Sequence, residues 1–111
     1  MTARRPDAVF AALGDPTRRK LLETVAADGP VTATELTRQL PISRQAIAKH
    51  LGVLRGAGLV DAERLGRETR FTATPGPLSE VSAWVDRVGA EWDRRLGRLT
   101  DVVDGTTRPR R

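Results

Sequence analysis

The sequence of 111 residues has no cysteine, no tyrosine and a single histidine, His50. Without cysteine the chain forms no disulfide, carries out no thiol chemistry and builds no cysteine-ligated metal site. One imidazole leaves almost no basis for a histidine-ligated metal site either. We therefore expect neither a metal ion nor a cofactor.

Other absences exclude a membrane protein and an enzyme. No apolar run approaches the roughly 20 residues of a membrane span, and residues 1–6 lack the apolar stretch of a signal peptide. These features predict a cytoplasmic protein without membrane contact. The sequence shows no nucleophile–base pair, phosphate-binding glycine loop or metal-ligand cluster, so we expect no enzymatic activity. The length predicts one domain, placed at residues 1–104, with residues 105–111 forming a disordered basic tail.

Positive charge is present in excess, and its location is more informative than its total. The net charge is +5 and the isoelectric point is near 11.2, which favours an anionic partner. From residue 38 to residue 55 the charged residues are Arg38, Arg44, Lys49 and Arg55, with no aspartate or glutamate. That segment alone supplies a charge of +4.

The same segment predicts a short amphipathic helix. Ser43 can cap its start, the apolar residues Ile47, Leu51 and Leu54 recur at intervals of four and three, and Gly58 suits a left-handed C-cap. The expected outward positions carry only cations and amides: Arg44, Gln45, Lys49, His50 and Arg55. Such a face suits a polyanion with readable base edges.

Three shorter helices are expected before the basic one, at residues 7–13, 16–27 and 33–40. Asp15 followed by Pro16 is a helix start, Thr32 and Glu35 form a capping-box pattern, and Val31 is expected in a very short strand. Helices joined by tight turns, with the last one basic on its outside, are typical of a helix-turn-helix.

After residue 60 the apolar pattern alternates, which predicts two strands joined by the two-residue turn Gly66-Arg67. A hairpin directly after a basic helix is typical of the wing of a winged helix-turn-helix. Arg64, Arg67 and Arg70 cluster at its tip, and Glu63 and Glu68 oppose them in sign.

A long helix is expected from residue 78 to residue 103. Its apolar positions repeat at seven, as in Leu78, Val85, Trp92 and Leu99. This stripe is more than a small core can cover, so we interpret the segment as a dimerisation helix. Trp84 and Trp92 are candidates for an effector pocket, although packing at an interface is the more common role of such residues.

Two motifs occur together with a specific spacing. They are the run Phe-Ala-Ala-Leu-Gly-Asp-Pro-Thr-Arg-Arg-Lys-Leu-Leu at residues 10–22 and the pattern His-Leu-x-x-Leu-x-x-Ala-Gly-Leu-Val at residues 50–60. With the turn at residues 65–67, the chain up to about Leu99 closely resembles the ArsR-type winged-helix repressors.

The resemblance implies a mainly helical fold with a small β-hairpin wing and a homodimer that binds a short inverted repeat in promoter double-stranded DNA. It implies a dimer interface between the first and last helices. The candidate interface residues are Val9, Phe10, Leu13, Leu78, Val81, Val85, Val88, Trp92, Leu96 and Leu99. The candidate DNA-binding residues are Ser43, Arg44, Gln45, Ala46, Lys49, His50, Arg64, Arg67 and Arg70.

The chain departs from the metal-sensing members of that family. Those members carry a cysteine pair in the third helix, where residues 35–40 have none, or aspartate and histidine ligands in the last helix, which here has no histidine. We therefore expect the metal-independent subgroup, with its small-molecule effector unknown. A winged-helix module that contacts protein instead of DNA is the alternative function, and the stretch of +4 charge disfavours it.

Overall fold

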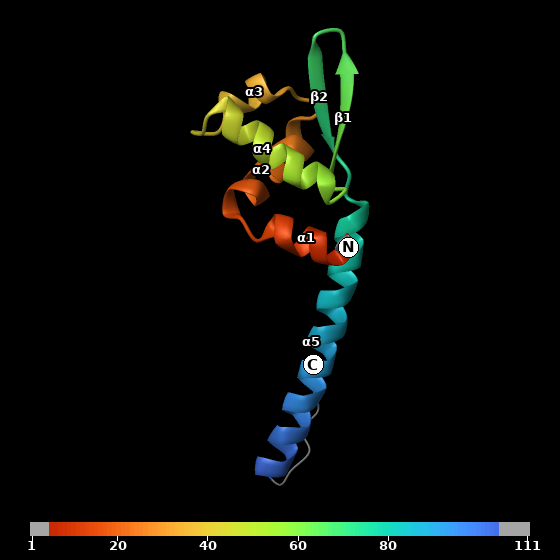
Figure 1. Ribbon diagram of the computed structural model, residues 1–111. Helices are drawn as coiled ribbons and strands as arrows, with labels where there is room; N and C mark the ends of the chain where they lie inside the picture. Colours follow the sequence, from red (N-terminus) through yellow and green to blue (C-terminus); the bar gives the residue numbers. More distant parts are fainter. Residues whose placement is uncertain (1–4, 105–111) are drawn as a thin grey trace. The chain divides into compact units, whose positions relative to one another are not determined.

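The computed structural model describes residues 5–104, and the expected basic tail at 105–111 lies outside the described residues. Within this range the chain forms five helices and one antiparallel hairpin (Figure 1). In chain order they are α1 (Arg5–Leu13), α2 (Pro16–Asp28), α3 (Ala33–Thr37), α4 (Arg44–Gly56), β1 (Val60–Leu65), β2 (Glu68–Ala73) and α5 (Gly76–Asp104). The chain divides into two compact units, the first ending at Val81 and the second beginning at Ser82.

The side chains of Asp15 and Arg18 fix the turn between α1 and α2. Asp15 caps α2 as predicted, and its Oδ1 accepts the backbone N–H groups of Thr17 at 2.7 Å and Arg18 at 3.3 Å. The Arg18 guanidinium reaches back to the end of α1, where its Nε donates to the carbonyl of Ala12 at 2.7 Å and its Nη2 to that of Ala11 at 3.1 Å. These bonds satisfy carbonyls that a helix end otherwise leaves without partners.

Helix α3 begins as predicted and ends earlier. The N–H of Thr32 donates to Glu35 Oε1 at 2.9 Å and the N–H of Glu35 donates to Thr32 Oγ1 at 3.1 Å, which completes the capping box. The prediction that this helix continues to Leu40 is wrong, because it ends at Thr37. The next two N–H groups bond three residues back instead of four, and Pro41, which has no N–H, then prevents a helix from continuing.

Both predicted ends of α4 are confirmed. Ser43 Oγ accepts the backbone N–H of Ala46 at 3.1 Å. Just past the other end, Gly58 has a φ of +78°, a left-handed conformation that favours glycine. The chain thereby turns into β1, and the N–H of Leu59 donates to the carbonyl of Leu54 at 3.0 Å.

The hairpin has the predicted turn. Its register pairs Val60 with Ala73 at one end, and Gly66 and Arg67 connect the strands at the other. Gly66, the first central residue of the turn, has a φ of +63°. The predicted short strand at Val31 is present as a single bridge to Phe71 of β2.

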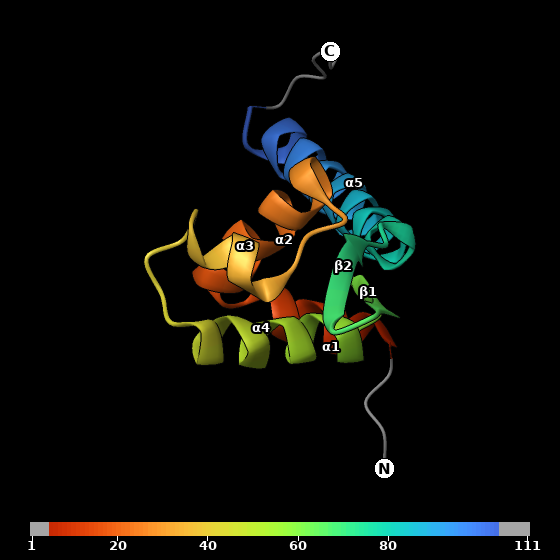
Figure 2. The same ribbon diagram turned by 90° about the horizontal axis from the view of Figure 1, so that it is seen from above.

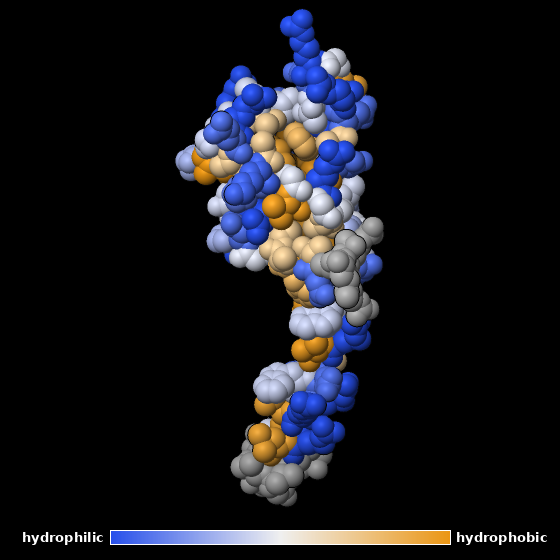
Figure 3. All heavy atoms as spheres, in the orientation of Figure 1, coloured by the Kyte–Doolittle hydropathy of each residue, from blue (hydrophilic) through white to orange (hydrophobic). Residues whose placement is uncertain are grey.

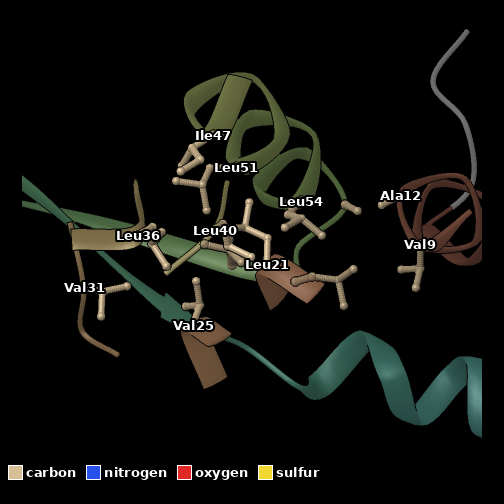
Figure 4. Close-up of a cluster of buried hydrophobic side chains, with 13 residues drawn as sticks. Val9, Ala12, Leu21, Val25, Val31, Leu36, Leu40, Ile47, Leu51 and Leu54 are labelled. Atoms are coloured by element: carbon tan, nitrogen blue, oxygen red, sulfur yellow. The ribbon is translucent and has the colours of Figure 1, made fainter. Parts of the chain in front are cut away.

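One hydrophobic core joins the elements of the first unit. Helix α4 packs against α2 and α3, and the hairpin contacts α2, α3 and α4. Figure 4 shows the apolar side chains of α4 directed toward those of α2 and α3. The largest buried side chains are Val9, Leu21, Val25, Leu36, Ile47, Leu51, Leu54 and Leu59. Leu78 and Val81, in the first turns of α5, are half-buried against this core.

The predicted long helix is confirmed as α5, although it starts two residues earlier, at Gly76. From Ser82 onward it belongs to the second unit. Over the residues described, no helix combines the length and the apolar content that crossing a bilayer requires.

Packing of α4 predicts a clear stability difference between two leucines. Leu51 is 1% exposed and Leu65, at the tip of the hairpin, is 49% exposed. We expect Leu51→Ala to lower the free energy of unfolding by about 2–5 kcal/mol, because it leaves a cavity in the core. The matched control Leu65→Ala should change it by less than about 0.5 kcal/mol. Urea denaturation at one protein concentration measures both, and equal losses would contradict this account of the core.

Two capping carboxyls hold their negative charge more strongly than free side chains do. Burial by itself raises the pKa of Asp15, but the N–H groups of Arg18 and Thr17 and the neighbouring positive charges outweigh it and leave the pKa below its usual value. The backbone N–H and the hydroxyl of Thr32 are the main causes of a lowered pKa for Glu35. A carboxyl with a lowered pKa stabilises the fold above its unfolded pKa, and this contribution is lost as the pH falls through the folded pKa.

The substitution Asp15→Asn tests this pH dependence. Asparagine can still cap the helix, but it does not titrate. We expect the free energy of unfolding of the wild type to exceed that of the variant near neutral pH, and the difference to shrink between about pH 5 and about pH 3. Urea titrations at several pH values measure it. Parallel pH curves for the two proteins would show that Asp15 has no such role.

Candidate nucleic-acid interface

Helix α4 has one buried face and one exposed face. Ile47, Leu51 and Leu54 are buried in the core, so the helical period turns the residues between them toward solvent. Arg44, Gln45, Lys49 and Arg55 are all exposed. Figures 1 and 2 show α4 along one side of the first unit, with α3 and the hairpin beside it. The predicted basic face is therefore open to a partner.

The side chains of this face are not engaged by other parts of the described chain. No aspartate or glutamate occurs between residues 38 and 55. The side chains of Arg44, Gln45 and Lys49 make no hydrogen bond or ion pair with any residue in the described part of the chain. A cation that has no acidic partner within the protein is available to pair with an anion from outside. This arrangement suits contacts to phosphate and to base edges.

His50 is placed differently from the prediction. It was expected to point outward, but it is half-buried, and its Nδ1 is enclosed without a hydrogen-bond partner among the described residues. Its charge is among the influences that lower the pKa of Asp15, so the imidazole lies near the start of α2. The reason is helical geometry, since position 50 follows Ile47 by three residues and precedes Leu54 by four. Ala46 is also half-buried.

The three hairpin arginines differ in what they contact. Arg67 lies exposed in the turn and makes no hydrogen bond or ion pair within the described residues. Arg64 donates from Nε to the carbonyl of Gly66 at 3.0 Å. Arg70 forms an ion pair with Glu68, in which Nη2 and Oε1 are 2.9 Å apart. Of the three, Arg67 is thus the most available to a partner.

A cleft of about 680 Å³ lies between α3, the start of α4 and the hairpin. Four arginines line it: Arg38 just after α3, Arg44 at the start of α4, and Arg64 and Arg67 in the hairpin. Arg38 was counted in the basic segment of the sequence but was not among the predicted site residues. Its signal was its place just after α3 in a stretch without acidic residues.

The second unit carries an apolar stripe along its helix. Trp84, Val85, Val88, Trp92, Leu96 and Leu99 are each between 42% and 59% exposed. Figure 3 shows hydrophobic side chains following one side of this part of α5 and hydrophilic ones following the other. On its flank, Arg95 Nη2 and Glu91 Oε1 form an ion pair at 3.0 Å.

The remaining candidate interface residues lie in the first unit, and one of them is corrected. Val9 is 0% exposed within the core, so it has no surface to offer a partner. Leu13, Leu78 and Val81 are half-buried against the core, whereas Phe10 is 36% exposed. Alternation of exposure along the short α1 explains the difference between Val9 and Phe10, because neighbours on a helix point about 100° apart.

Comparison with known proteins identifies the same architecture. A family model described as a helix-turn-helix domain matches residues 13–63. The HTH-type transcriptional regulator Rv2034 of Mycobacterium tuberculosis is 37% identical over 103 residues, covering 93% of this chain and 92% of that protein. The transcriptional repressor SdpR of Bacillus subtilis is 31% identical over 77 residues, covering 69% of this chain and 84% of that protein.

A solved structure of an ArsR-like transcriptional regulator from Rhodococcus sp. RHA1 is also similar. It is 42% identical, covers 88% of this chain and 92% of its own, and has a TM-score of 0.75. These similarities favour a regulator that contacts DNA over a module that contacts only protein. The chain belongs to the ArsR-type winged helix-turn-helix proteins, a family of DNA-binding transcriptional regulators and not of enzymes.

Proposed function

We propose that this chain represses transcription as a homodimer that occupies an inverted repeat in promoter DNA. The observation that carries the proposal is the exposed face of α4, which presents arginine, lysine and glutamine and no carboxylate. Two such helices about one turn of duplex apart contact adjacent major grooves. A dimer bound in this way excludes polymerase from the promoter by occupying its site.

Base reading is assigned to the start of α4. The Gln45 amide can pair with both the N6 and N7 positions of adenine, whereas Arg44 and Lys49 can bind guanine or phosphate. Ser43 lies at the helix start, where backbone N–H groups favour a phosphate. Ala46 offers only part of its methyl group to a thymine, because it is half-buried.

The hairpin is assigned to the DNA backbone. Arg67 is exposed in the turn and has no internal partner among the described residues, and Arg64 lies beside it with one of its guanidinium nitrogens bonded to Gly66. Arg70 is committed to Glu68 of the same strand. Contacts of this kind hold the protein in register but carry no direct sequence information.

His50 is assigned a positioning role. Its half-buried ring and its nearness to Asp15 connect α4 to the start of α2. In this position it sets how α4 lies on the first unit and leaves the contact with bases to Gln45.

Dimerisation is assigned to the apolar stripe of α5. Exposed apolar patches on a small protein mark interaction sites, and the members of this stripe from Val85 to Leu99 recur at helical spacing. A second copy of the chain presents the same stripe, and an isologous contact of identical surfaces is the usual form of a twofold dimer. Trp84 and Trp92 are assigned to this packing.

We further propose that a metal ion does not regulate the protein. The chain lacks cysteine and has one histidine, and the described residues contain no group of three or more histidine, aspartate or glutamate side chains placed to hold a metal. Soft metals prefer thiolate and imidazole ligands over isolated carboxylates.

Base reading and backbone contact predict different effects for two substitutions. Gln45→Ala should reduce the difference in binding free energy between the preferred base and the other bases at one position of each half-site, by about 1–3 kcal/mol. Arg67→Ala should instead weaken binding to all sequences and make the salt dependence of binding shallower by about one unit of slope per contact. Sequencing of DNA selected from a random library by each purified variant, followed by titrations in graded salt, measures both. An equal loss on all sequences from Gln45→Ala would refute its assignment.

Dimerisation through the apolar stripe predicts different oligomeric states for two variants of α5. Val88→Glu places a carboxylate in the stripe, whereas Ala90→Glu places the same group on an exposed position of the other side of the helix. Sedimentation equilibrium at about 10 μM should give twice the 12.1 kDa chain mass for the wild type and for Ala90→Glu, and a lower mass for Val88→Glu. A monomeric wild type, or an unchanged Val88→Glu dimer, would exclude dimerisation through this stripe.

A further inference from the structure

The cleft between α3, α4 and the hairpin carries a net positive charge on its lining. Its ionisable residues are Glu35, Arg38, Arg44, Arg64, Arg67 and Glu68. Four cations and two carboxylates give the lining a charge of +2. These side chains come from segments far apart in the sequence, so the fold itself creates this concentration of charge.

The arginine side chains of the cleft have hydrogen-bond donors that no described residue accepts. The side chains of Arg38 and Arg44 make no hydrogen bond or ion pair with any described residue, although the charge of Arg38 helps to lower the pKa of Glu35. Arg64 uses only its Nε, which donates to Gly66. A guanidinium has five N–H donors in a planar fork, which matches the oxygens of a phosphate.

The two carboxylates of the cleft are already engaged. Glu35 Oε1 accepts the N–H of Thr32 at 2.9 Å as part of the capping box. Glu68 Oε1 accepts from Arg70 Nη2 at 2.9 Å. An anion that enters the cleft therefore meets free cations and carboxylates whose charge is partly neutralised by protein donors.

The cleft is continuous with the proposed DNA-reading face. Arg44 lines the cleft and also begins the basic face of α4, and Arg67 lines its other side in the exposed turn. Thr34, Arg38 and Glu68 on its walls are all exposed. A small ligand site normally buries most of its ligand, whereas an open, cationic trough between a reading helix and a hairpin suits an extended polyanion.

We propose that this cleft seats one phosphodiester strand of the bound DNA, and that Arg38 is a phosphate-binding residue outside both α4 and the hairpin. The strand that borders the groove read by α4 passes from Arg44 toward Arg67 through the cleft. This inference rests on the proposed DNA-binding role of α4 and adds a third segment of the chain to the interface. Arg38 then contributes affinity on every sequence without contributing to base preference.

The substitution Arg38→Gln tests the proposal, with Arg94→Gln as the matched control. Both variants remove one positive charge from an exposed side chain, but Arg94 lies in α5 and lines neither the cleft nor the basic face of α4. The probe is a fluorescein-labelled duplex that carries an inverted repeat selected by the wild type, together with a random duplex of the same length. Fluorescence anisotropy at several KCl concentrations gives the affinity and its salt slope, and thermal melting confirms that both variants fold.

We expect Arg38→Gln to weaken binding to both duplexes and to make the salt slope shallower by about 0.9 for each bound subunit. Arg94→Gln should change the slope less. Arg38→Lys should restore the slope, because a lysine supplies the charge although it lacks the planar fork. The sequences selected by Arg38→Gln should remain those of the wild type.

Several results would overturn the proposal. A wild-type slope in Arg38→Gln would show that Arg38 does not contact a phosphate. An identical loss in Arg94→Gln would show that Arg38 contributes only general charge. Displacement of the duplex by millimolar inorganic phosphate at constant ionic strength, with no slope change in Arg38→Gln, would assign the cleft to a free anion. A wild type that binds neither duplex would overturn the proposed function as well, whereas the other results leave that function intact.

Discussion

The burial of one side of α4 against α2 and α3 is the constraint on which the rest of the structure depends. Ile47, Leu51 and Leu54 occupy the core, and a helix is rigid, so burying these three positions fixes the direction of every other side chain on it. The basic residues face outward because the apolar ones face inward. The same packing orients the end of the helix, where Gly58 directs the chain into the hairpin.

Around this helix, hydrogen bonds at chain turns determine where neighbouring elements begin and end. Arg18 holds the end of α1, and the capping box of Thr32 and Glu35 starts α3. The same box engages the Glu35 carboxylate, which leaves Arg38 without a bonded acid beside it. The capping box therefore stabilises the start of α3 and also leaves the positive charge of Arg38 unpaired in the cleft.

The two units of the chain present surfaces of different chemistry. The first unit presents cations on α4, in the turn of the hairpin and in the cleft between them. The second presents an apolar stripe with ion-paired polar residues on its flank. Electrostatic attraction serves a polyanionic partner, whereas apolar area serves an apolar one, so the two surfaces do not compete.

The sequence by itself determined the features that depend on neighbours a few residues apart. The caps at Ser43 and Thr32, the turn at Gly66 and the amphipathic pattern of α4 were all predictable, because local hydrogen bonds and helical period decide them. Only the tertiary structure showed how deeply Val9 and His50 are buried. It alone brought Arg38, just after α3, into one cleft with the arginines of α4 and the hairpin, since contacts between residues distant in sequence arise only when the core forms.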